Sequence, residues 1–184
     1  MEPPNYKYLL CLALLFSLFS CENDIKKVNM LTSRTKSPSE SATNIEILYS
    51  DSAKVKTKIT APVMNKYYDI DTPYLEMPKG VKVIFYNDSL IENSRLTANY
   101  AIRYDKRNIM EARYNVIVVN EKGEQLNTER LIWDEDSAKI KTPDFVKITT
   151  KDEIIMGKGL ESNQTFTKYH ILNVTGTFPL NKEK

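Results

Sequence analysis

The chain has 184 residues, a formal net charge of +2 and only two cysteines, Cys11 and Cys21. This length suits a single domain that can bury a sizeable core. Because the net charge is small and no basic patch is concentrated in one segment, the composition argues against a protein that binds nucleic acid.

The first element in chain order is an apolar stretch near the N-terminus. Residues 9–20 carry no charge and are mostly Leu, Phe, Ala and Cys. The stretch is shorter than the roughly 20 residues that a membrane-spanning helix needs, and it suits the core of a signal peptide. The ending Leu18-Phe19-Ser20-Cys21 resembles the lipobox of bacterial lipoproteins, in which a peptidase cuts before a lipidated cysteine. We expect a signal peptide over residues 1–20 and lipidation of Cys21, with an uncleaved signal anchor as the alternative.

Residues 21–44 are predicted to form the lipidated N-terminus and a flexible linker. The part from Thr32 to Thr43 is rich in serine and nearly free of aliphatic side chains. Such a segment buries too little apolar surface to offset the entropy lost on ordering. Since both cysteines precede the linker or begin it, the domain that follows has no disulfide, and a domain of this size does not need one.

Residues 45–180 are predicted to form an almost purely β domain. Runs of Val, Ile, Thr, Tyr and Phe alternate with polar clusters at nearly regular intervals, which is the pattern of strands and turns. The strands would be about ten residues or longer, above the usual five or six. Long strands joined by tight polar turns favour an antiparallel meander. The clusters expected at turns are Asn87–Ser89, Asp105–Asn108, Asn120–Gly123, Asp134–Ser137 and Lys151–Glu153.

A faint internal repeat supports stacked hairpins, although coincidence is the alternative. Three Val-rich triplets are each followed, after a turn, by a leucine: Val81-Lys82-Val83 by Leu96, Val116-Ile117-Val118 by Leu131, and Val146-Lys147-Ile148 by Leu160. The best helical candidate, from about Ile91 to Tyr104, fits a strand with a bend equally well.

The sequence offers little for catalysis. The single histidine, His170, lies in a strand-like context and has no partner at recognisable spacing. Nucleophile elbows, zinc motifs and phosphate-binding glycine loops are absent from the sequence. The acidic groups Asp69 with Asp71 and Asp134–Asp136 lack the spacing of a calcium loop and are interpreted as solvated turn charge. We therefore predict no enzymatic activity, no metal and no cofactor.

The strand sequences themselves carry a resemblance. In this order, four segments resemble the LptC family, the periplasmic component of lipopolysaccharide export: Leu96–Ala101, Leu126–Asp134, Ile140–Pro143 with Val146–Ile148, and Gly157–Ser162. The resemblance covers roughly residues 45–177. It implies an antiparallel β-jellyroll of stacked long strands, as in LptA, LptC and OstA. It also implies a carrier that receives lipopolysaccharide from an inner-membrane ABC transporter and passes it to the next β-jellyroll carrier.

Such a carrier needs an apolar interior, because exposing an acyl chain of a dozen methylenes to water costs on the order of 10 kcal/mol. Side chains alternate along a strand, so one face can line a lipid slot. Ordinary core packing is the alternative interpretation for each of these residues. The interior candidates are Val83, Phe85, Leu96, Ala98, Tyr100, Val116, Val118, Leu131, Trp133, Val146 and Ile148.

The resemblance also implies partners. They are lipopolysaccharide, the permease and ATPase of the inner-membrane transporter, and an LptA-like carrier that pairs with an edge strand. Gly157 and Gly159, where backbones can approach closely, are the candidates near such an edge. The expected location is the periplasm, with Cys21 anchoring the chain to the inner membrane in place of the usual transmembrane helix. The outer membrane is the alternative, because lipoproteins can be sorted outward.

Two other functions remain open at this point. A non-catalytic cell-envelope lipoprotein that acts as a protein-binding or structural module would share the signal, the linker and the β domain, but would have a solid core. A glycan-active enzyme would need carboxylates that converge in a cleft, and the sequence gives no sign of them.

The predicted division into anchor, linker and domain can be tested with Cys21→Ser. This variant should be released from the membrane or misplaced while its domain stays folded, because the lipid and the core are separate parts of the chain. Membrane fractionation and protease resistance measure the two effects. Cys11→Ser, within the signal peptide, should leave anchoring intact, and loss of folding in Cys21→Ser would contradict the division.

Overall fold

The computed structural model describes residues 37–68 and 71–180, and these form an antiparallel β domain without an α-helix. The signal peptide, Cys21 and the linker up to residue 36 lie outside the described residues. One short 3-10 helix, η2, covers Asp105–Arg107. The strands are β1 (Glu40–Asp51), β2 (Lys54–Tyr67), β3 (Tyr74–Met77), β4 (Val81–Tyr86), β5 (Glu92–Ala98), β6 (Tyr100–Tyr104), β7 (Ile109–Asn120), β8 (Gln125–Asp134), β9 (Lys139–Thr149), β10 (Glu153–Asn163) and β11 (Tyr169–Pro179).

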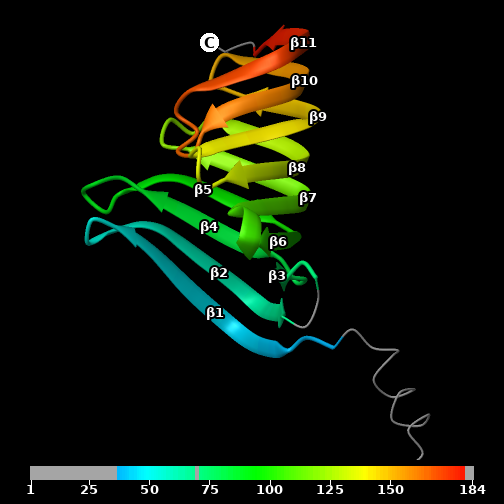
Figure 1. The fold of residues 1–184 in the computed structure, drawn as a ribbon. Coiled ribbons are helices and arrows are strands. Elements are labelled where there is room, and N and C mark those ends of the chain that lie inside the picture. The colour runs from blue at the N-terminus through cyan, green and yellow to red at the C-terminus, as the bar shows by residue number, and fades with distance from the viewer. Residues whose placement is uncertain (1–36, 69–70, 181–184) are drawn as a thin grey trace, which may run out of the picture. The chain divides into compact units, whose positions relative to one another are not determined.

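All eleven strands belong to one sheet, stacked from β1 at one end to β11 at the other (Figure 1). Between the long strands β2 and β7 the sheet divides into two rows. Strands β4 and β5 link residues 57–60 of β2 to residues 117–120 of β7, whereas β3 and β6 link residues 65–67 of β2 to residues 109–113 of β7. We call the half of the sheet in line with β4 and β5 the first wall and the half in line with β3 and β6 the second wall. The long strands contribute to both, and Trp133 of β8 lies in the second wall, because its partner Met110 pairs with β6 on the other side. The predicted all-β, jellyroll-type architecture is confirmed.

The two walls face each other across one interior. Phe85 of β4 and Trp133 of β8 are not on neighbouring strands, yet their ring centroids lie 5.5 Å apart. Apolar side chains from successive strands also meet in layers; for example, Val118, Leu126 and Ile148 are adjacent in register on β7, β8 and β9, and all are buried. Burying such a side chain contributes about 1.5–3 kcal/mol, so these layers supply much of the domain's stability.

Long strands pass from one wall to the other through a bend near their middle. The pairing registers shift between Arg113 and Val116 in β7, between Thr128 and Ile132 in β8, and between Lys158 and Leu160 in β10. Bulges of this kind bend a strand and increase its twist. Repeated on successive strands, they fold the whole sheet around the interior.

The turns lie where the polar clusters predicted them, and side chains of Asn stabilise two of them. The Asn87 Oδ1 atom accepts hydrogen bonds from the backbone N–H groups of Ser89 and Ile91, at 2.9 and 3.0 Å. The Asn120 Oδ1 atom accepts equivalent bonds from Lys122 and Glu124, both at 3.0 Å. Asn favours turns because its side chain can replace a backbone acceptor in this way.

The N-terminal strand begins earlier than the sequence suggested. The linker was expected to extend to residue 44, but β1 starts at Glu40, which pairs with Lys66 of β2. The backbone N–H of Ser39 also donates to the Lys66 carbonyl at 2.8 Å. Because β2 offers a continuous row of backbone partners, the polar residues before Ile45 join the sheet without an apolar face of their own.

Two glycines provide a matched test of the bend in β10. Gly159 and Gly123 both have positive φ, +80° and +79°, but a Cβ at Gly159 would lie 2.9 Å from Leu172 Cδ1 whereas a Cβ at Gly123 would meet nothing within 4 Å. Gly123→Ala should therefore lower the free energy of unfolding by about 1 kcal/mol, from backbone strain alone. Gly159→Ala should lower it by about 1–2 kcal/mol, because the half-exposed Leu172 side chain must also move away. Urea unfolding measures both, and equal losses would contradict the close approach of β11.

Candidate functional site

The interior between the two walls is the first candidate site. Ten of the eleven residues predicted from the sequence to face inward belong to the apolar core or pack directly against it. Trp133 is partly buried, and the other nine are no more than 6% exposed. The structure therefore brings them together, while binding of lipid to them stays a prediction. The ten are Val83, Phe85, Leu96, Ala98, Val116, Val118, Leu131, Trp133, Val146 and Ile148.

Tyr100 is the exception, because it faces away from the interior. The sequence placed it on one face with Leu96 and Ala98, but the strand breaks at Asn99, which separates β5 from β6. The break shifts the alternation by one residue, so the neighbouring Ala101 points inward and is fully buried. The Tyr100 hydroxyl donates to Glu76 Oε2 at 3.0 Å. Burial and this hydrogen bond raise the pKa of the Tyr100 phenol.

A cavity of about 840 Å³ opens between the walls at the end formed by the β1–β2 and β8–β9 connections. We call it the mouth. Its volume is within the range of ordinary ligand-binding pockets. Polar side chains line most of it, and two aromatic rings line its inner side. Among its residues are Tyr49, Thr57, Phe85, Asn93, Trp133, Glu135 and Gln164.

Behind the mouth the interior is closely packed. The void there measures only about 20 Å³ and is lined entirely by apolar and aromatic side chains. Phe85 and Trp133 line both the mouth and this void, and their rings meet edge to face, with an interplanar angle of 81°. The aromatic pair therefore separates a polar cavity from the apolar interior. The other residues around the void are Val83, Leu96, Met110, Ala112, Leu131 and Ile140.

Three of the four charged side chains that line the mouth form ion pairs, and the fourth, Asp51, accepts a hydrogen bond from Ser52. Arg103 donates to both carboxylate oxygens of Glu135, at 2.9 and 3.0 Å, and also pairs with Asp105. The hydrogen bond to Glu135 raises the pKa of the Arg103 guanidinium, and burial raises the pKa of the nearby Tyr49 phenol. On the opposite rim Lys56 pairs with Asp88, which lowers the pKa of that carboxyl. The mouth is thus polar but has little unpaired charge for an anion to bind.

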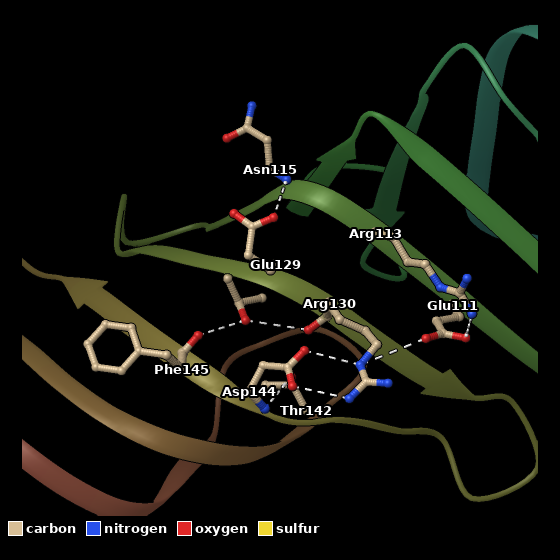
Figure 2. Close-up of polar contacts among 9 residues, drawn as sticks. Glu111, Arg113, Asn115, Glu129, Arg130, Thr142, Asp144 and Phe145 are labelled. Carbon is tan, nitrogen blue, oxygen red and sulfur yellow. Dashed lines mark hydrogen bonds and ion pairs between the residues drawn. The ribbon is translucent and has the colours of Figure 1, made fainter.

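An ion-pair network holds the outer side of the bends. Figure 2 shows the Arg130 side chain between Glu111 and Asp144, from the strands on either side of its own. Its guanidinium donates two hydrogen bonds of 3.1 Å to Asp144 and lies 3.8 Å from Glu111. Arg113 donates to Glu111 at 2.6 Å, which raises the pKa of the Arg113 guanidinium. Since Glu111 is only 8% exposed, these arginines compensate a nearly buried carboxylate.

The two glycines predicted near a partner-binding edge lie one strand in from it. Gly157 and Gly159 are on β10, which pairs with both β9 and β11. A Cβ at Gly157 would come within 2.6 Å of the Asn173 carbonyl oxygen, so this glycine allows β11 to approach closely. Strand β11 has one strand partner in the described part of the chain, and its other side forms the sheet edge. Its second half is exposed on both faces, with Val174 at 58% and Phe178 at 53%.

The described residues offer no grouping of three or more His, Cys, Asp or Glu side chains that could hold a metal ion. His170 lies exposed on β11. None of the helices in this part of the chain is both long and apolar enough to cross a membrane.

Comparison with known proteins identifies one family. The model of the family described as "LptC: Lipopolysaccharide-assembly, LptC-related" matches residues 8–178, which is most of the chain. A search of curated proteins gives no match.

The network in Figure 2 predicts unequal effects for two arginines. Arg130→Met should lower the free energy of unfolding by about 1–2 kcal/mol, because it removes a two-point ion pair and leaves Glu111 with one partner. Arg95→Met, which removes only the exposed pair with Glu92, should cost about 0.5 kcal/mol or less. Urea denaturation of both variants measures the difference, and equal losses would show that the network does not stabilise the bends.

Proposed function

The chain belongs to the LptC family of lipopolysaccharide-assembly proteins and takes part in lipopolysaccharide transport, and we propose that it is a membrane-anchored periplasmic carrier. In this role it receives lipopolysaccharide from the inner-membrane ABC transporter and passes it to the next β-jellyroll carrier. The observation that carries the proposal is an apolar interior, enclosed by two walls, that meets a cavity of about 840 Å³ at one end.

The apolar character of the interior suits an acyl chain. Its layers of Val, Leu and Ile run from strand to strand without a charged side chain between them. Transfer of each methylene from water to such surroundings is favourable by about 0.8 kcal/mol, so burial of a long acyl chain is strongly favoured. The polar mouth next to it suits the part of the same lipid that stays hydrated.

Transfer to the next carrier would use the edge formed by β11. An edge strand presents unpaired N–H and C=O groups, and an LptA-like jellyroll could extend the sheet by pairing with them. The exposed apolar side chains on the second half of β11 support this assignment, because a partner would cover them. The candidate surface is therefore β11 itself, with Gly157 and Gly159 of the adjacent strand allowing its close packing.

Lipidation of Cys21 would keep the domain beside the transporter. Cys21 would carry two or more acyl chains, and attachment by at least two chains is stable. The linker after it would let the domain reach its partners. This anchor replaces the single transmembrane helix of familiar LptC proteins, and it places the carrier in the periplasm at the inner membrane, with the outer membrane as the alternative.

A second candidate function rests on the close packing of the interior. Residues such as Leu126 and Val146 are fully buried, and the void among the apolar side chains is only about 20 Å³. A protein-binding or structural lipoprotein of the cell envelope would have such a core and would bind no lipid inside it.

Photo-crosslinking in living cells separates the two functions. A photoreactive residue at position 85 or 133 should form adducts with lipopolysaccharide, because both side chains line the mouth and the interior. The matched control positions are Tyr100, which faces outward, and Phe145, which is 54% exposed. Adducts at the first pair and none at the controls support the carrier, whereas a structural lipoprotein would give none at any position.

Depletion of a carrier should also cause lipopolysaccharide to accumulate at the inner membrane.

A further inference from the structure

Phe85 and Trp133 lie where the mouth meets the small void in the apolar interior. They are the two residues that line both the cavity of about 840 Å³ and the small void behind it. The edge-to-face contact between their rings joins the first wall to the second. An acyl chain that moves from the mouth into this void therefore meets these two rings first.

Both rings lie near the ends of their strands, at the border of the mouth. Phe85 is the second-last residue of β4, beside a register shift, and Trp133 is the second-last residue of β8, beside the β8–β9 turn. Trp133 is only partly buried and borders the open mouth, whereas Phe85 is 3% exposed. Trp133 is therefore the ring with room to swing into the mouth.

The indole of Trp133 is held in an unfavourable position. Its Nε1 atom is buried, and no acceptor in the described part of the chain receives its hydrogen bond. A buried donor without a partner destabilises the state that contains it, because the group has lost its water. The mouth holds carboxylate, amide and hydroxyl oxygens, including those of Thr57 and Gln164. The unpaired N–H therefore destabilises the closed position of the Trp133 ring. Movement toward the mouth would let this N–H form a hydrogen bond.

We propose that Phe85 and Trp133 form a movable partition that opens to admit an acyl chain of a lipid from the mouth into the interior. The proposal rests on the carrier function and specifies where the cargo passes. The contact between the rings keeps the apolar interior closed to water when no lipid is present. The unpaired indole N–H keeps the closed state from being too stable to open.

Three substitutions test the partition through the rate at which an acyl chain is taken up. The probe is 11-(dansylamino)undecanoic acid, whose emission rises in apolar surroundings, mixed by stopped flow with the full chain held in an amphipathic polymer. Phe85→Ala removes half of the partition and should speed uptake at least about fivefold. Trp133→Phe keeps a ring but removes the unpaired donor, so the closed state is stabilised and uptake should slow by about fivefold.

Phe145→Ala is the matched control, because it also removes an aromatic ring, but from an exposed position on β9 outside the interior and away from the partition. Its uptake rate should equal that of the unchanged protein. Thermal unfolding of each variant establishes that it is folded.

The outcomes separate this inference from the function on which it rests. Opposite effects of Phe85→Ala and Trp133→Phe on the rate support the partition. Uptake by the unchanged protein with the same rate in all three variants overturns the partition and leaves the carrier function standing. Absence of uptake by the unchanged protein overturns the carrier function itself.

Discussion

The structure depends on one geometric constraint, which is that successive long strands bend at the same level. A flat sheet of this many strands would leave one face of apolar side chains in water, and no helix is available in the described chain to cover it. The bends turn the two halves of the sheet toward each other. The apolar faces of both halves then pack together and form the core. Everything else that matters here, including the interior, the mouth and the free edge, follows from that bend.

The bends need support on both sides. On the inner side, apolar layers from both walls pack together and exclude water. On the outer side, the backbone is irregular: Tyr114 and Asn115 have positive φ values of 63° and 53°, which is unfavourable for residues with a side chain. The pairs of Arg130 with Glu111 and Asp144 cross three strands next to this irregular segment. Charged groups thus stabilise the surface where regular pairing is interrupted.

Sequence reasoning succeeded where short-range chemistry decides the structure. Polar clusters such as Asn120–Gly123 gave the turns, because Asn and Gly have local reasons to occupy them. Alternation gave the inward faces of strands such as β4, since Val83 and Phe85 are separated by one residue. It was wrong for Tyr100, because alternation holds only within an unbroken strand and the break at Asn99 has no distinctive residue pattern.

Other features could not be predicted because they depend on which strands become neighbours and on their register. Arg130 and Asp144 lie on consecutive strands that the predicted meander makes neighbours, but their pairing depends on the register shift in β8, which the sequence does not indicate. Nothing in the sequence indicates the pair of Arg103 with Glu135, or the contact between Phe85 and Trp133. The start of β1 at Glu40 could not be predicted for a related reason. Its first residues are polar and join the sheet through backbone pairing with β2, which their side chains do not indicate.

A closed interior agrees with a carrier as well as with a structural protein, and the reason is energetic. An empty slot wide enough for a lipid would expose its apolar lining to water at a cost of about 25 cal/mol for each Å². A carrier without cargo is therefore expected to collapse its slot by bringing its walls together, as the packed layers here do. What distinguishes the carrier is a weak point in that packing, and a buried donor without an acceptor is such a weakness. In the described part of this chain, the Trp133 indole is such a donor, and the Asn93 and Ser94 side chains near Phe85 also carry buried polar atoms without partners.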